Sequence, residues 1–74
     1  MNQNEFLTEL KEMMMLSEDL NKSDRLIDIE AFDSMTHLIL LSLYEEKFNI
    51  KLESEDLINA ETVCDLLKLA GLSD

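Results

Sequence analysis

Three side chains near the middle of the sequence have the chemical types of a nucleophile and its helpers. Asp33, Ser34 and His37 fall within five positions, in the stretch IEAFDSMTHL. The spacing would let the Ser34 hydroxyl approach His37, which could act as its base. Serine catalysis also needs an oriented base and a preorganised oxyanion hole, and the chain has no glycine elbow to build one. We therefore expect no catalytic residue here, and we expect His37 at the edge of the core or on a partner surface.

The same stretch contains the signals for the start of a helix. Asp33 can cap a helix by accepting N–H bonds that the first turn leaves unmade. Ser34 then lies at the helix N-terminus, where a partial positive charge and unpaired N–H groups favour an attached phosphate. The simpler interpretation is that the Asp-Ser pair is only a cap, since caps are common.

Other chemistry is sparse in the chain. Cys64 is the only cysteine, which excludes an intramolecular disulfide and fits a reducing compartment. It lies in an apolar helical run without a neighbouring His, Arg or Lys, so we expect a small core residue rather than a reactive thiol. The acids are spread along the sequence with no calcium-loop motif and no His/Cys cluster, so we expect no metal site.

Size and charge narrow the possible functions. The 74 residues suffice for one domain, residues 1–74, with little stability to spare for a deep catalytic cleft, so we expect a protein that is not an enzyme. Apolar residues make up 46% of the chain, which favours a folded core over a disordered acidic tail. The formal net charge of −11 would repel nucleic acid and anionic membranes, and favours protein partners that present Lys and Arg. We see no signal peptide and no apolar run of ~20 residues, so we expect a cytoplasmic protein without a membrane span.

The pattern of apolar residues predicts an all-α fold. The chain has no proline and a single glycine, Gly71, so the usual turn signals of hairpins are missing. We expect a first helix over residues 4–16, a second from the Asp33 cap to about residue 48, a short third helix capped by Ser54, and a last helix capped by Thr62 and ending near Gly71. The apolar residues 26–29 in the long connection should pack back over the helices. The sequence thus predicts a small four-helix bundle with three longer helices and one short one.

The second long helix is apolar on more than one side. Its natural core stripe, at 100° per residue, consists of His37, Leu40, Leu41, Tyr44 and Phe48. The opposite side consists of Met35, Ile39, Ser42 and Glu46, with Leu38 and Leu43 on the flanks. A helix of a small bundle should be polar there, so either a neighbouring segment or a partner must cover these apolar side chains.

Taken together, these residues resemble the acyl carrier protein family. Asp33-Ser34-Met35 is similar to the Asp-Ser-Leu/Met motif of that family, and the helix ending in EEKF, the short SEDL helix and the TVCDL opening of the last helix follow the same order over residues 4 to 70. The resemblance implies an acyl-carrier-like bundle in which Ser34 bears a 4′-phosphopantetheine arm derived from coenzyme A, with Asp33 as the flanking motif residue. It also implies a phosphopantetheinyl transferase (holo-carrier synthase) that attaches the arm, enzymes that load and transfer an acyl thioester, and a monomeric carrier that catalyses nothing itself.

The chain departs from the family pattern in ways that affect its partners. Ala31 stands where members commonly have Gly, so the turn before the second helix must suit Ala. Beyond Asp33 the second helix has only two acids, so we expect a more hydrophobic docking surface and a specialised fatty-acid-like, polyketide or other secondary pathway. The residues of that expected surface are Met35, Leu38, Ile39, Glu45 and Glu46. Two alternatives stay open: a D-alanyl, aminoacyl or peptidyl carrier, and an acidic interaction module that is never modified.

Overall fold

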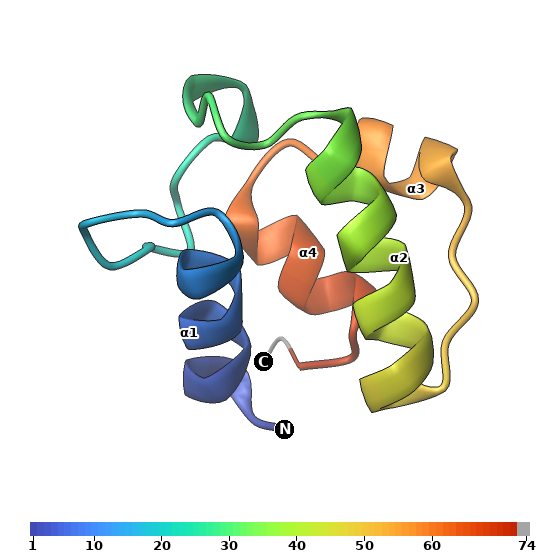
Figure 1. The fold of residues 1–74 in the computed structure, drawn as a ribbon. Coiled ribbons are helices and arrows are strands. Elements are labelled where there is room, and N and C mark those ends of the chain that lie inside the picture. The colour runs from blue at the N-terminus through green and yellow to red at the C-terminus, as the bar shows by residue number, and fades with distance from the viewer. Residues whose placement is uncertain (73–74) are drawn as a thin grey trace.

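The computed structural model describes residues 1–72, and within them the fold is all-helical. The helices are α1 (Gln3–Met13), α2 (Ser34–Phe48), α3 (Ser54–Ile58) and α4 (Val63–Leu69), with a short 3₁₀ turn, η1 (Leu26–Asp28), in the long connection. In Figure 1, α1 and α2 flank α4, and α3 lies beside the N-terminal half of α2. The prediction of a small helical bundle is confirmed, although α4, with seven residues, is closer in length to the short α3 than to α1 or α2.

The core is held together by side chains from three helices. Phe6 of α1 packs against Tyr44 and Phe48 of α2, with ring centroids 5.7 and 5.9 Å apart. The buried Tyr44 hydroxyl donates to the Leu66 carbonyl of α4 at 2.6 Å, so its polar end is satisfied inside the core. The helix α4 contributes the buried residues Val63, Leu66 and Leu67, and its C-cap residue Ala70 is buried as well. A few large side chains therefore join α1, α2 and α4.

Both ends of α4 agree with the sequence signals. Thr62 caps α4 and its Oγ1 accepts from the Asp65 N–H at 3.3 Å, as the capping box predicts. Gly71 follows α4 with φ +75°, a left-handed conformation that glycine adopts without strain. Both predictions are confirmed.

Two other helix ends were predicted wrongly. Ser54 is the first residue of α3 and Glu53 is the N-cap, with the Glu53 N–H donating to the Asp56 carboxylate at 2.9 Å. Helix α1 ends at Met13, before the expected residue 16, because Met15 turns left-handed with φ +55°. The Leu16 N–H then bonds back to the Lys11 carbonyl at 3.0 Å, which closes the helix.

A backbone strap ties the long connection to the start of α4. The strap consists of residues 22–26, and three hydrogen bonds join it to residues 61–64 around the start of α4. They run from the Leu26 N–H to the Glu61 carbonyl, from the Val63 N–H to the Asp24 carbonyl and from the Cys64 N–H to the Lys22 carbonyl, at 2.9, 3.0 and 2.9 Å. Figure 1 shows this teal segment passing beside the orange start of α4. Leu26 is buried as expected, whereas Ile27 is 82% exposed, so the prediction that the whole 26–29 segment packs inward is wrong for Ile27.

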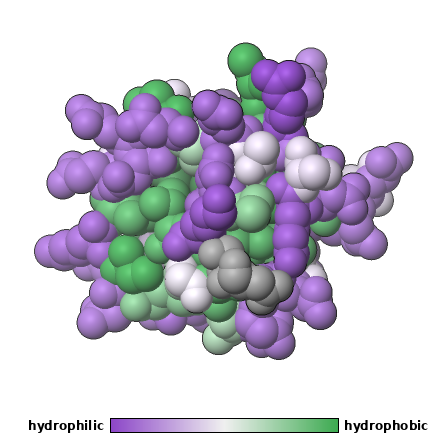
Figure 2. Space-filling model, turned by 180° about the vertical axis from the view of Figure 1, so that it is seen from behind, coloured by the Kyte–Doolittle hydropathy of each residue, from purple (hydrophilic) through white to green (hydrophobic). Residues whose placement is uncertain are grey.

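Apolar surface remains between the charged side chains. Figure 2 shows hydrophilic side chains around the rim of the molecule seen from behind, with hydrophobic areas between them. Within residues 1–72 the structure has one ion pair, Lys11 with Asp19, at 2.8 Å. No helix in this described part is long and apolar enough to cross a membrane.

Candidate functional site

The N-terminus of α2 presents a serine hydroxyl to solvent. Asp33 is the N-cap, with an extended backbone, and its carboxylate accepts from the Thr36 N–H at 3.1 Å. That hydrogen bond favours the ionised carboxylate and holds the pKa of the Asp33 carboxyl below its usual range. Ser34 follows as the first helical residue and is exposed. Within residues 1–72 its hydroxyl has no hydrogen-bond partner, because the cap bond is made by Asp33 alone.

Thr36 fixes the turn that leads into α2. Its side chain is buried, and its Oγ1 donates to the Ala31 carbonyl at 2.6 Å while its N–H is bound by Asp33. One residue therefore holds the chain on both sides of Phe32. Positive φ among the described non-glycine residues occurs at Met15 and Asn49, so Ala31 adopts a conformation that needs no glycine. Sequence reasoning missed Thr36 as an anchor; the signal was a hydroxyl three residues after an Asp cap.

His37 lies against the same turn without contacting the serine hydroxyl. Its ring packs edge-on to Phe32, with centroids 4.7 Å apart, and it is half-buried. No hydrogen bond joins His37 to Ser34 anywhere in the described structure. His37 thus lies at the edge of the core, which is one of the two places expected for it, and the structure shows no hydrogen bond for the nucleophile–base pairing that its spacing allowed.

An apolar strip runs down α2 from Ser34. Met35, Leu38 and Ile39 are 70%, 66% and 43% exposed, and the helical spacing places them on one side. No neighbouring segment covers them fully. Glu45 and Glu46, further along the helix, are also exposed. The five residues expected to form a partner surface thus all reach solvent.

The buried side of α2 differs in part from the predicted stripe. Leu40 and Tyr44 are fully buried as expected, whereas Leu41 and Phe48 are only half-buried. Leu43, expected on the flank of the exposed side, is 8% exposed and belongs to the core. Because α2 has apolar residues all around, its sequence alone does not fix which face turns inward.

Two surface grooves adjoin the start of α2. One, of about 460 Å³, is lined by apolar residues of η1, α3 and the turn, among them Ile27, Phe32 and Ile58, together with His37. The other, of about 640 Å³, lies between the connection that follows α1 and the segment before α2. Ile27 and Ile58 are both largely exposed, and nothing in the sequence marked either as a surface residue.

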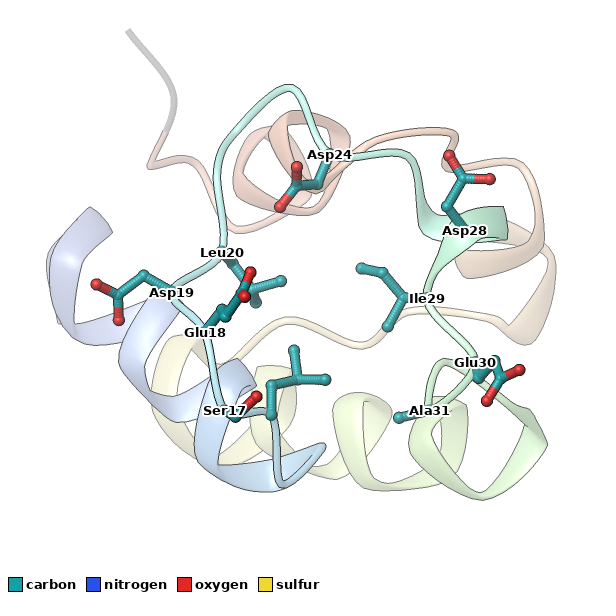
Figure 3. Close-up of a pocket in the computed structure, with 10 residues that line it drawn as sticks. Ser17, Glu18, Asp19, Leu20, Asp24, Asp28, Ile29, Glu30 and Ala31 are labelled. Atoms are coloured by element: carbon teal, nitrogen blue, oxygen red, sulfur yellow. The ribbon is translucent and has the colours of Figure 1, made fainter.

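The second groove has an apolar floor and an acidic edge. Figure 3 shows Leu20 and Ile29 pointing toward one another from its two sides, while the carboxylates of Asp19 and Glu30 point outward. Within residues 1–72 no three His, Cys, Asp or Glu side chains come close enough to hold a metal ion. Cys64 lies elsewhere, half-buried near the start of α4.

Comparison with protein-family models, with curated proteins and with solved structures gives no match for this chain. The evidence for a function therefore lies in the motif and in the geometry around Ser34. The observations that bear on it are an exposed serine on a helix N-terminus, a turn fixed by Thr36, and an uncovered apolar strip beside the serine.

Proposed function

We propose that this chain is an acyl carrier protein whose Ser34 bears a 4′-phosphopantetheine arm. The observation that carries the proposal is the exposed Ser34 hydroxyl at the first position of the 15-residue helix α2. It supports the resemblance of Asp33-Ser34-Met35 to the family motif because an attachment serine must be reachable and free of competing bonds. The acyl-carrier-like character of the bundle is part of the same proposal.

The residues around Ser34 fit a phosphodiester-linked arm. The N-terminus of α2 carries a partial positive charge that favours a phosphate group. Asp33 makes the cap bond, so modification of Ser34 need not break a bond that holds the helix. Such an arm supplies a thiol that carries the cargo as a thioester. Ser34 is the acceptor in its attachment: its Oγ bonds to phosphorus, its proton passes to a base of the transferase, and adenosine bisphosphate leaves from coenzyme A.

The apolar strip and the acids of α2 suit the enzymes that would meet the carrier. Met35, Leu38 and Ile39 offer uncovered apolar area beside the attachment point, and exposed apolar patches mark interaction sites. Glu45 and Glu46 add negative charge that speeds encounter with basic enzymes. We assign these five residues as the partner surface for a transferase and for acyl-loading and acyl-transferring enzymes. The cargo is an acyl group of a specialised pathway, with an aminoacyl or peptidyl cargo as the alternative on the same arm.

The test is the intact mass of the protein after incubation with coenzyme A and a broad-specificity phosphopantetheinyl transferase. We expect the wild type to gain one phosphopantetheine, and Ser34→Ala to gain none while keeping its helical circular dichroism, because Asp33 still caps α2. Ser42, which is exposed on the same helix, is the matched control: Ser42→Ala should be modified fully. An unmodified wild type, or an arm on another serine, would favour an interaction module that uses the apolar strip without modification.

A further inference from the structure

A groove of about 560 Å³ between α1 and α2 combines an apolar floor with an acidic rim. Its floor is lined by apolar side chains of both helices, namely Met13, Ile39 and Leu43. Its rim bears three carboxylates and one ammonium group, those of Glu9, Glu12, Glu46 and Lys47. The groove therefore lies on the C-terminal side of the apolar strip and extends it onto α1.

The floor is only partly covered by the protein itself. Ile39 is 43% exposed and Met13 is half-buried, although both belong to helices whose neighbouring residues form the core. Burial of such apolar area by a partner is favourable. Methionine also adapts its shape to the side chain it meets.

The rim favours a positively charged occupant. Three carboxylates against one ammonium group give the rim a net charge of −2 by simple subtraction. Glu9 and Glu12 stand three positions apart on α1, where helical side chains are neighbours. Within residues 1–72 the one salt bridge joins Lys11 to Asp19. None of the three rim carboxylates is therefore neutralised by a salt bridge in this part of the chain. An uncompensated acidic rim around an apolar floor matches an apolar side chain flanked by Lys or Arg.

We propose that the groove receives a surface of the phosphopantetheinyl transferase that modifies Ser34, on which an apolar side chain is flanked by Lys or Arg, so that α1 forms half of the docking site. This inference rests on the proposed function, and it adds Glu9, Glu12 and Met13 to the partner surface. Ile39 lies five residues beyond Ser34, which is about 7.5 Å along the helix axis. A standard interface covers about 800 Å² on each partner, enough for one enzyme to fill the groove and reach the Ser34 hydroxyl.

The first measurement maps the contact without chemistry. Unlabelled transferase is added, without coenzyme A, to the ¹⁵N-labelled chain, and amide shifts are followed by NMR. We expect the largest changes at residues 9–13 of α1 together with residues 39–47 of α2. Changes on α2 that leave α1 untouched, or changes centred on the groove of Figure 3, would overturn the proposal.

The second measurement compares two double variants with the same net charge. For Glu9→Gln/Glu12→Gln we expect kcat/KM for Ser34 modification to fall about five- to ten-fold, with kcat unchanged and a smaller effect at high salt. The control is Glu18→Gln/Glu61→Gln, which removes two exposed acids outside the groove and should change kcat/KM less than about two-fold. If the wild type is modified and the two double variants are modified equally fast, the groove proposal is refuted but the carrier function is not. A wild type that gains no mass refutes the carrier function itself and, with it, this occupant.

Discussion

The turn before Ser34 depends on one buried hydroxyl, and Thr36→Val removes it with almost no change of shape. The Thr36 Oγ1 donates to the Ala31 carbonyl at 2.6 Å, and the side chain is 6% exposed. A typical hydrogen bond contributes about 1 kcal/mol net, and an unsatisfied buried partner costs about 1–3 kcal/mol. The Ala31 site is only partly buried, so we expect a loss of about 1.5 kcal/mol. In a domain of this size that lowers Tm by roughly 6–12 °C.

Thr8→Val is the matched control, because the Thr8 hydroxyl donates to the Asn4 carbonyl at 2.9 Å on the exposed side of α1. The same atoms are removed, but both groups remain open to water, so we expect a change under about 0.5 kcal/mol. Thermal and urea unfolding followed by circular dichroism give the two free energies. We also expect slower phosphopantetheinylation of Thr36→Val below its Tm, because the Ser34 turn loses one of its two anchors. Equal unfolding free energies for the two variants would refute the anchoring role of Thr36.

Three further predictions test other parts of the structure. Ile39→Glu should change Tm little and should slow the modification of Ser34, since Ile39 is 43% exposed. Leu40→Glu should abolish the melting transition, because Leu40 is fully buried. Similar losses of Tm for the two variants would show that Ile39 is a core residue. Met15→Gly should raise stability by about 1 kcal/mol, because Met15 is 90% exposed and left-handed; a lower Tm would contradict this strain. Hydrogen bonds from the Glu61 and Thr62 N–H groups lower the pKa of Asp65 in the folded protein. The stability that Asp65 contributes is therefore complete above its pKa in the unfolded chain, about 3.9, and is lost as the pH falls through its folded pKa. Tm measured from pH 7 to 2 should therefore fall less steeply for Asp65→Asn, and an unchanged slope would exclude this contribution.

Local sequence signals predicted those features that depend on neighbours in the chain. The Asp33 and Thr62 caps and the Gly71 stop each involve a residue and its next few positions, and the structure has all three. The same reasoning failed at Met15, because a left-handed methionine has no local signature. It also predicted Ser54 as the N-cap of α3, where the structure has Glu53, because the side chain of either residue can stand at the N-cap.

The missed features depend on residues far apart in sequence. Leu43 is buried because α2 packs with a particular rotation against α1 and α4, and an all-round apolar helix does not encode that rotation. Ile27 is exposed while its neighbour Leu26 is buried, and the Leu26 N–H is bonded to the carbonyl of Glu61, which lies far away in the sequence. The α1–α2 groove likewise needs two helices to meet, so no pattern within either helix could predict it.

The strap of residues 22–26 also determines how the molecule opens. The amide protons of Leu26, Val63 and Cys64 are held by bonds that cross between the long connection and α4, so they can exchange with solvent only when these two segments separate. Local openings of this kind release groups of amides together. These three protons should therefore exchange with deuterium at one common free energy. This free energy of exchange should differ from that of the amides at the fraying ends of α1. We therefore expect the connection that leads to Ser34 and the last helix to open as one cooperative unit.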